Sequence, residues 1–336
     1  MPNKKSERGE HKQFPFAGEG VDVAQATDGV VDRPKSGFVA IIGPTNAGKS
    51  TLINTIMGRK VSIVSHKVQT TRTRIRAVKM IEGSQLIFVD TPGIFKPTRN
   101  LDRAMVKAAN EAAADANAIL LMIDAKHGIT ETTKQITASI CCHPGSDRAG
   151  APSIPVYAVI NKVDAVDKAS LLPLAAELNE MGIFKEIFMI SALKNNGVDR
   201  ILETLANDMP ECPYLFDQKD LVDVPDTLWL SEMTREKIYK FIHQELPYQI
   251  HVSTDKIDTD DEGVIEIMQT IYVKSQGHKK IIIGKGGEQL KQIGMLARHD
   301  IQDEWRVNAR LKIFVRVEDW ENNKEHYESQ GLKYVK

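Results

Sequence analysis

Five short apolar runs recur in the first 192 residues, and helical patterns separate them. Each run is rich in β-branched residues, which is typical of strands buried on both faces of a sheet. The intervening segments 101–117 and 168–182 have helical patterns. Strands that alternate with helices predict an α/β domain with a mostly parallel, doubly wound sheet. The runs are GFVAIIG (37–43), SQLIFVDTPG (84–93), AILLMIDA (118–125), IPVYAVINKVD (154–164) and EIFMISA (186–192).

The last third of the chain has a different order of elements. Residues 230–247 have a helical pattern, two strand patterns follow at 249–257 and 264–275, and a helix is expected at 288–305. The final strand pattern, 308–320, alternates cleanly, so its two faces differ. One face has Leu311, Ile313, Val315 and Val317, and the other has Arg310, Lys312, Phe314 and Arg316. This order predicts a separate α+β domain.

Composition marks the boundaries between these parts. Residues 1–36 are polar and without periodicity, which indicates a disordered tail, and prolines among acidic residues after position 210 indicate a linker. We therefore expect a tail (1–36), a first domain (37–210), a linker (211–226), a second domain (227–325) and a C-terminal tail (326–336). The segment 141–153 is expected to be a surface loop.

The stretch GPTNAGKST (43–51) follows the first strand pattern and precedes a plausible helix. It fits the phosphate-binding pattern G-x-x-x-x-G-K-[ST], in which backbone N–H groups and the helix N-terminus favour phosphate anions. Lys49 would reach the β- and γ-phosphates, and Ser50 would bind Mg²⁺. The nucleotide-binding residues expected here are Gly43, Asn46, Ala47, Gly48, Lys49, Ser50 and Thr51.

Three further motifs follow strands in the expected order. Asp90 in DTPG would hold Mg²⁺, and Gly93 can present its N–H to the γ-phosphate. NKVD (Asn161, Lys162, Asp164) and SA (Ser191, Ala192) end later strands, so these loops meet at one edge of the sheet. Asp164 can accept both N1–H and the 2-amino group of guanine, whereas adenine would leave the carboxylate unpaired. The predicted ligand is GTP or GDP.

These motifs resemble those of the Era family of GTPases. The stretch VSIVSHKVQTTRTRIRAV (61–78) is similar to the family's switch I, which implies a metal and γ-phosphate role for Thr71, with Thr70 as the competing choice. Lys49, Thr71 and Gly93 are thus the expected catalytic residues. Ile94 stands where Ras-like proteins have a water-orienting glutamine, so slow intrinsic hydrolysis is one interpretation.

Asn46 has two interpretations that the sequence leaves open. Related GTPases use an asparagine in this loop to help bind K⁺ beside the phosphates. A turn asparagine that hydrogen-bonds its own loop explains the residue equally well.

A second glycine-rich stretch, GKGG (284–287), lacks the G-K-[ST] ending and opens a helix. A helix, a G-x-x-G turn and a second helix flanked by three strands are the pattern of a KH domain, whose turn clamps the backbone of single-stranded RNA. Lysines surround the turn, and a plain solvated surface is the alternative. The expected RNA-binding residues are Lys280, Gly284, Lys285, Gly286, Gly287 and Lys291.

Composition restricts partners and location. The 336 residues have a net charge of −1, so any nucleic-acid surface must be local. Three cysteines and no apolar run of membrane-spanning length indicate a cytoplasmic protein. The sequence has no lipid-anchor motif and no strongly basic amphipathic helix.

A single GTPase domain followed by a type II KH domain resembles the Era architecture. REK (235–237), ELPY (245–248) and VRVEDW (315–320) match patterns of its second domain. The resemblance implies a Mg²⁺-dependent GTPase, expected as a monomer, that binds the 3′ end of small-subunit (16S) ribosomal RNA and assists 30S assembly; DNA is not an expected partner. Two alternatives stay open: an RNA-binding protein whose pocket is mainly regulatory, and a GTPase at the periphery of the inner membrane that couples growth and cell cycle.

Overall fold

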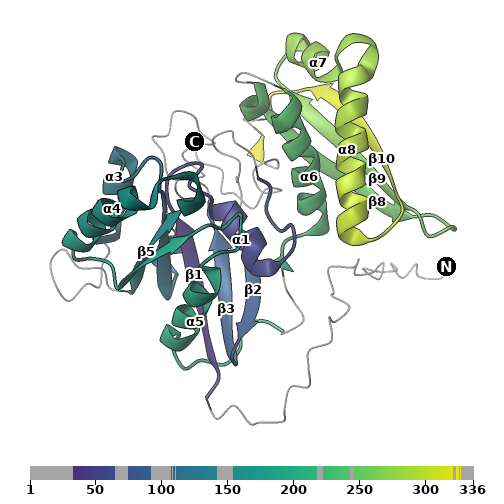
Figure 1. Cartoon of the computed structure of the whole chain (residues 1–336). Coiled ribbons are helices and arrows are strands. Elements are labelled where there is room, and N and C mark those ends of the chain that lie inside the picture. The colour runs from purple at the N-terminus through teal and green to yellow at the C-terminus, as the bar shows by residue number, and fades with distance from the viewer. Residues whose placement is uncertain are drawn as a thin grey trace.

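The computed structural model describes residues 33–64, 75–91, 107, 109, 111–141, 154–217, 222–242, 246–320, 323, 324 and 326. These residues form two domains, each with helices and a sheet of its own (Figure 1). Within these ranges, no helix combines the length and the apolar character needed to cross a membrane.

The first domain is built on a seven-stranded sheet with the order β6-β5-β4-β1-β3-β2-β7. The five strands from β6 to β3 are parallel, whereas β2 and β7 join the sheet as antiparallel partners. The mostly parallel sheet predicted from the sequence is confirmed. Its strands are β1 (Lys35–Ile42), β2 (Ile75–Ile81), β3 (Ser84–Asp90), β4 (Ala118–Asp124), β5 (Val156–Asn161), β6 (Glu186–Ile190) and β7 (Val222–Asp223).

Helices cover both faces of this sheet, because alternate strand residues are apolar on both sides. In β1, Val39 and Ile41 pack in the core under α1 and α5, and Ala40 and Ile42 pack in the core under α3 and α4. The helices leave uncovered the end of the sheet at which the parallel strands have their carboxyl ends, and the motif loops lie at that end. The helices are α1 (Lys49–Met57), α3 (Glu131–Cys141), α4 (Lys168–Glu180) and α5 (Val198–Asp208), with a 3₁₀ turn at Val163–Ala165.

The second domain places three helices on one face of a three-stranded sheet with the order β10-β9-β8. β10 is parallel to β9, and β8 is antiparallel to it. Apolar residues of the helices and strands form the core between these layers. The elements are α6 (Asp226–Phe241), a 3₁₀ turn (Leu246–Gln249), β8 (Ile250–Thr259), β9 (Ile265–Val273), α7 (Gln276–Ile283), a 3₁₀ turn (Lys285–Gly287), α8 (Glu288–Trp305) and β10 (Ala309–Val317).

The boundaries differ from the sequence prediction at two places. β1 begins at Lys35, inside the predicted tail, because Ser36 is buried and its hydroxyl donates to the Pro213 carbonyl at 2.8 Å. The predicted linker supplies β7, which pairs with β2. Residues 142–153 of the predicted loop lie outside the described residues, as do residues 1–32 of the tail and most of 101–110.

Candidate functional site

The ammonium group of Lys49 lies inside the loop that precedes α1. Its Nζ donates to the carbonyls of Gly43, at 3.1 Å, and Pro44, at 2.8 Å. Burial lowers the pKa of Lys49 to about 8, against the opposing attraction of Asp90. A phosphate anion placed in this loop would stabilise the charged form. Gly43 has a φ of +149°, and a Cβ there would lie 2.6 Å from the Met122 carbonyl, so no other residue fits without a shift.

Ser50 and Asp90, predicted as the metal pair, lie in direct contact. The Ser50 hydroxyl donates to Asp90 Oδ2 at 3.0 Å, and Asp90 is fully buried at the end of β3. A carboxylate and a hydroxyl are hard oxygen ligands, which suit Mg²⁺. The Ser62 hydroxyl donates to the same Asp90 oxygen at 2.8 Å, which the sequence analysis did not predict.

Asn161 ties together the loops that surround the expected nucleotide. Its side chain is buried; Nδ2 donates to the Ala47 carbonyl at 2.9 Å, and Oδ1 accepts from the Ala192 amide at 3.0 Å. A Cβ on Gly48 would lie 2.2 Å from Asn161 Nδ2, so glycine is needed for this approach. Asn161 and the Ala192 amide therefore brace the site in this structure.

Lys162 connects the phosphate loop to a carboxylate that the sequence analysis missed. Its Nζ donates to the Asn46 carbonyl and to Asp124 Oδ2, both at 2.7 Å. Burial disfavours the charged form of Asp124, but hydrogen bonds from Lys162 and the Lys126 amide outweigh this effect and lower its pKa. Asp124 ends β4 as Asp90 ends β3. A carboxylate at the carboxyl end of a buried strand could therefore have identified Asp124 as a site residue from the sequence.

Asp164 has the environment expected of a guanine-binding carboxylate. A hydrogen bond with Ser191 lowers its pKa and outweighs the slight desolvation of the carboxylate, and Lys194 Nζ lies 3.6 Å from Oδ2. The group is therefore a charged acceptor at neutral pH. Asn46 is exposed, with a φ of +62°, which is the left-handed turn conformation that asparagine tolerates. Its potassium role stays a prediction.

Thr71 and Gly93, predicted as catalytic, lie outside the described residues, as do Thr70 and Ile94. Their roles stay predictions. Thr51 lies in the first turn of α1 beside Ser50, and its nucleotide-binding role stays a prediction.

In the second domain, the GKGG turn joins α7 to α8. Gly284, Gly286 and Gly287 have φ values of +74°, +63° and +83°. A Cβ on Gly284 would lie 2.6 Å from Gln289 Cβ, whereas a Cβ on Gly286 or Gly287 would meet no atom of the described residues within 4 Å. Gly284 is thus needed for packing, and the other two glycines leave the outer side of the turn open to a ligand.

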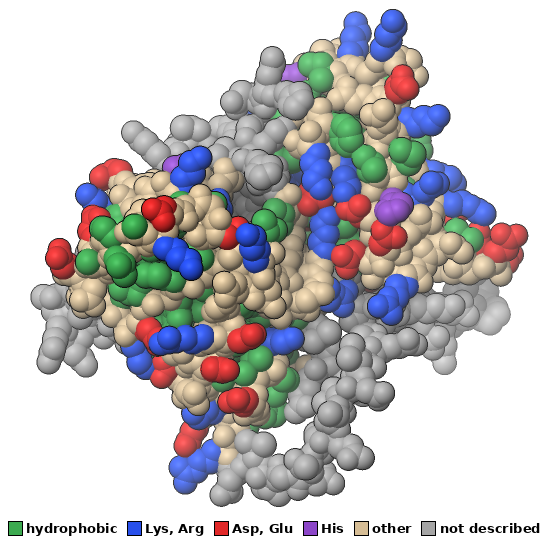
Figure 2. Space-filling model, in the orientation of Figure 1, with side chains coloured by type: hydrophobic (Ala, Val, Ile, Leu, Met, Phe, Trp, Pro, Cys, Tyr) green, Lys and Arg blue, Asp and Glu red, His purple; other side chains and the backbone are tan. Residues whose placement is uncertain are grey.

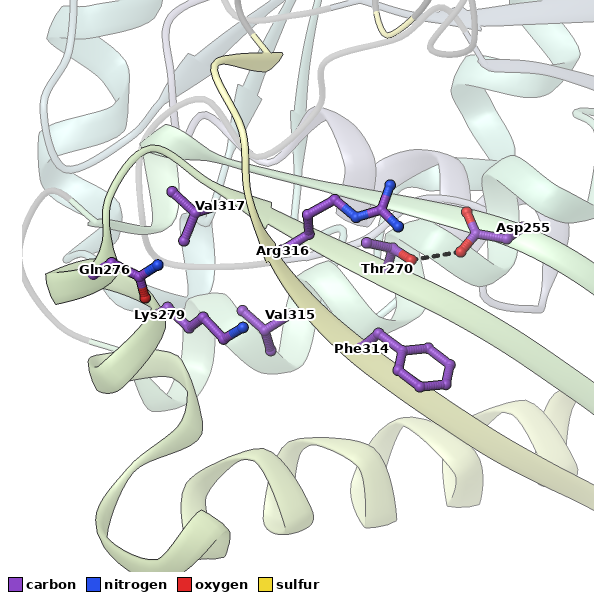
Figure 3. A pocket seen from close by; sticks show the side chains of 8 residues that line it. All are labelled: Asp255, Thr270, Gln276, Lys279, Phe314, Val315, Arg316 and Val317. Carbon is purple, nitrogen blue, oxygen red and sulfur yellow. Dashed lines mark hydrogen bonds between the residues drawn. The ribbon is translucent and has the colours of Figure 1, made fainter.

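A groove of about 610 Å³ lies between α7 and β10 (Figure 3). This volume is within the range of ligand sites, about 300 to 1,000 Å³. β10 is the last strand of its sheet, so its outer edge pairs with no further strand in the described part of the chain. The groove is lined by Asp255, Thr270, Gln276, Lys279, Phe314, Val315, Arg316 and Val317.

Two cationic side chains, Lys279 and Arg316, line the groove. Lys280, Lys285 and Lys291 are exposed, and Figure 2 shows Lys and Arg side chains gathered at the α7 end of the second domain. The sequence analysis had placed Phe314 and Arg316 on a basic strand face without assigning them to a site. Residues on both faces of β10 line the groove, because it lies along the outer edge of this strand. The alternation of polar and apolar residues in the sequence separates the two faces and does not show that both reach one groove.

Comparisons with known proteins agree with the assignment of both domains. Residues 38–162 match a family described as 50S ribosome-binding GTPase, and residues 245–322 match the KH domain family. GTPase Era of Sinorhizobium medicae (strain WSM419) is 43% identical over 316 residues, which cover 94% of this chain and 99% of that protein. GTPase Era of Rhizobium meliloti (strain 1021) is 44% identical over 303 residues, which cover 90% of this chain and 94% of the relative.

Two solved structures have the same two-domain arrangement. A crystal structure of Era in complex with MgGDPNP and nucleotides 1506–1542 of 16S ribosomal RNA matches with a TM-score of 0.82 and 36% identity, over 89% of this chain and 99% of that chain. A variant of Aquifex aeolicus Era bound to GDP·AlF₄⁻ matches with a TM-score of 0.81 and 36% identity, over 88% and 99% of the two chains.

Proposed function

The chain belongs to the Era family of GTPases, and from this premise we propose that it binds the 3′ end of 16S ribosomal RNA and assists assembly of the 30S subunit. Its enzymatic reaction is the Mg²⁺-dependent hydrolysis of GTP to GDP and phosphate. The RNA and the 30S subunit are the proposed partners, and the KH domain is the proposed RNA-binding part.

The residues of the first domain have separate tasks in hydrolysis. The Ser50 hydroxyl and the Asp90 carboxylate would hold Mg²⁺, which would supply positive charge at the phosphates of the nucleotide. Lys49 would add a positive charge at the same phosphates. Asp164 selects guanine through two hydrogen bonds, since a bound base would desolvate this carboxylate and adenine would leave it unpaired, which costs binding energy. Asn161 and Lys162 keep the loops in register.

The groove beside β10 is the observation that supports the RNA half of the proposal. The KH domain has an open turn with two unobstructed glycines, exposed lysines in and around the turn, and a groove that includes the aromatic side chain of Phe314. Glycines let the turn approach phosphates closely, lysines attract them, and aromatic side chains stack on bases. Unpaired bases are required for this contact, which favours a single-stranded RNA end over a duplex.

The RNA sequence in the proposal comes from the relatives. A structure 36% identical to this chain contains Era with nucleotides 1506–1542 of 16S ribosomal RNA, and the alignment covers 99% of that chain. The groove of this chain occurs within the matched KH domain. We therefore propose the same RNA end as its ligand.

A fluorescence anisotropy titration tests this function. The full chain is titrated against an RNA oligonucleotide of the 16S 3′ end, a scrambled RNA and a DNA of the same sequence, with a non-hydrolysable GTP analogue or GDP bound. We expect the 3′-end RNA to bind at least tenfold more tightly than the two controls. Equal affinity for all three oligonucleotides would refute the assignment. Multiple-turnover hydrolysis in the same samples separates an active GTPase from a regulatory pocket.

The location of the protein belongs to the same proposal. We propose a cytoplasmic monomer, because ribosomal subunits assemble in that compartment and the sequence has only three cysteines. Cell fractionation and sedimentation measure both properties. Recovery of the protein with membranes at physiological salt would favour the peripheral alternative.

A further inference from the structure

The segment from Gly58 to Val64 touches both the metal site and the KH domain. It connects α1 to the region that precedes β2. At its centre, Ser62 is 1% exposed, and its hydroxyl donates to Asp90 Oδ2 at 2.8 Å. The Ser50 hydroxyl donates to the same oxygen at 3.0 Å. Asp90 therefore receives one hydrogen bond from a metal-ligand residue and one from a residue that is not a ligand.

The first domain holds this segment through Asn54. Asn54 Oδ1 accepts from the amides of Val61, at 2.9 Å, and Ser62, at 2.8 Å. Asn54 Nδ2 donates to the Ser62 carbonyl at 2.7 Å. Because Asn54 lies in α1, the backbone at Ser62 is fixed relative to the phosphate loop that opens the same helix.

The KH domain holds the same segment from the other side. The Val64 amide donates to Glu236 Oε1 at 3.1 Å, and the indole of Trp229 donates to the Lys60 carbonyl at 3.2 Å. Lys60 Nζ forms ion pairs with Glu236, at 2.8 Å, and Asp300, at 2.9 Å. These partners belong to α6 and α8, so both helices contact the segment.

The charges at this junction are mutually compensated. The Glu236 side chain is 3% exposed and also pairs with Lys237 and Lys240. Burial disfavours the charged form of Lys60, but hydrogen bonds and charges of Glu236 and Asp300 outweigh it and raise its pKa. Acidic and basic side chains lie close together along the junction of the domains in Figure 2. The ion pairs therefore form a specific contact between the domains.

We propose that Ser62 is a positioning residue for the metal-binding carboxylate of Asp90, and that the KH domain holds Ser62 in place through its contacts with Lys60 and Val64. A carboxylate that binds a metal is oriented by the donors around it, and loss of such a partner typically weakens metal affinity about 10- to 100-fold. The hydrogen bond from Ser62 orients the Asp90 carboxylate before Mg²⁺ binds. Metal binding then loses less entropy, because the rotation of the carboxylate is already restricted.

The proposal rests on the nucleotide-binding half of the proposed function and is independent of the RNA half. The measurement is the Mg²⁺ concentration that gives half-maximal binding of a fluorescent, non-hydrolysable GTP analogue by the full chain. A melting temperature for each variant shows whether the fold is retained. In Ser62→Ala we expect that Mg²⁺ concentration to rise about tenfold, and in Ser62→Thr, which restores a hydroxyl, to return close to the parent.

A matched serine distinguishes positioning from general destabilisation. Ser84 is also buried, and its hydroxyl donates to the Ala206 carbonyl at 3.0 Å, away from the site. Ser84→Ala should lower the melting temperature without changing the Mg²⁺ requirement. A parental Mg²⁺ requirement in Ser62→Ala would overturn the positioning role. A parent that does not bind the analogue at any Mg²⁺ concentration would instead refute the nucleotide-binding function, and binding that is independent of Mg²⁺ would overturn the metal site on which the positioning role depends.

Two aspartates of α8 test the contribution of the KH domain. Asp300 pairs with Lys60 and with the buried Lys237, whereas the exposed Asp303, in the next turn, pairs with His299 at 2.9 Å. Asp300→Asn should raise the Mg²⁺ requirement about threefold, in the direction of Ser62→Ala, since it weakens the hold on Lys60 by one of two ion pairs. Asp303→Asn should behave as the parent. Identical behaviour of the two aspartate variants would overturn the role of the KH domain.

Discussion

Replacing Lys285 and Gly286 by aspartate should remove most of the RNA affinity while the fold and the nucleotide site remain intact. A side chain at Gly286 would meet no atom of the described residues within 4 Å. The φ of +63° at this position is in the left-handed region, which aspartate tolerates at a cost of about 1 kcal/mol. The phosphate loop lies in the other domain, so GTP affinity should hardly change.

The size of the effect follows from the charges. The two substitutions change the charge of the turn by three units. At about 5 Å from a phosphate, one unit of charge in water contributes about 0.8 kcal/mol, and salt screening reduces the sum to about 2 kcal/mol. That corresponds to a loss of roughly 30-fold in affinity from charge alone. The side chain added at Gly286 should weaken binding further, because it keeps the RNA phosphates away from the backbone of the turn. Removal of one phosphate contact should also lower the slope of log K against log salt by about 0.7 for single-stranded RNA.

The assay is an anisotropy titration of the 16S 3′-end oligonucleotide at three or more salt concentrations. Gly263→Asp is the control for the glycine substitution: Gly263 has a φ of +79°, and its Cβ would also meet no described atom within 4 Å. It lies in the β8–β9 turn, where Ile265 pairs with Ala309, at the end of β10 opposite to the groove. If the double variant binds as tightly as the parent with the same salt slope, the GKGG stretch is only a turn between helices.

Four further predictions concern the nucleotide site and the domain junction. Asp164→Asn should shift preference from GTP toward xanthosine triphosphate in competition binding, and equal competition by ATP and GTP in the parent would refute guanine selection. Isolated protein should hydrolyse GTP faster in K⁺ than in Na⁺, and Asn46→Ala should abolish this gain; identical rates in both salts would leave Asn46 as a turn residue. Lys49→Ala should impair GTP binding, with RNA affinity equal to that of the nucleotide-free parent; GTP binding of parental strength would argue against its phosphate contact. Glu236→Gln should lower the free energy of unfolding at pH 7 by about 3 kcal/mol. Burial opposes the charged forms of Glu236 and Asp300, but their lysine partners outweigh it, so folding lowers the pKa of both carboxylates. Their contribution to stability is therefore present above about pH 4 and lost below it. Unfolding measured from pH 3 to pH 7 should therefore show the difference between variant and parent shrinking in acid, and a constant difference would contradict the ion pairs.

Periodicity and motif order were sufficient for most of the fold. The helix expected at 288–305 has those bounds in the structure, because its apolar face and the glycines before it define both ends. The linker was harder to predict. Its prolines and acidic residues indicate an extended connection, but some of its residues contact the first domain, and such contacts leave no pattern in the sequence. The Tyr214 hydroxyl donates to the Gly83 carbonyl at 2.8 Å, and Gln85 Oε1 accepts from the Leu215 amide at 2.8 Å.

The residues of the nucleotide site also fall into those that the sequence could predict and those that it could not. Lys49, Ser50 and Asp90 belong to local motifs whose spacing has a chemical reason, and the structure brings them together as predicted. Ser62 was missed because its role depends on a partner 28 residues away in sequence. Lys60 was missed because its partners belong to another domain. Such pairs have no local pattern, so only the folded chain reveals them.

The short strand β7 has a consequence for how the two domains are joined. It comes from the linker, yet it lies against β2 at Arg76 and Ala77 and ends the sheet of the first domain. A strand with an unpaired edge is a template for pairing with a second chain, and β2 has buried apolar residues such as Ile75 and Val78. A first domain cut before residue 222 would expose that edge, so its earliest failure would be aggregation through β2. We therefore expect the connection to the KH domain to limit pairing of the GTPase domain with a second chain where β7 covers Arg76 and Ala77.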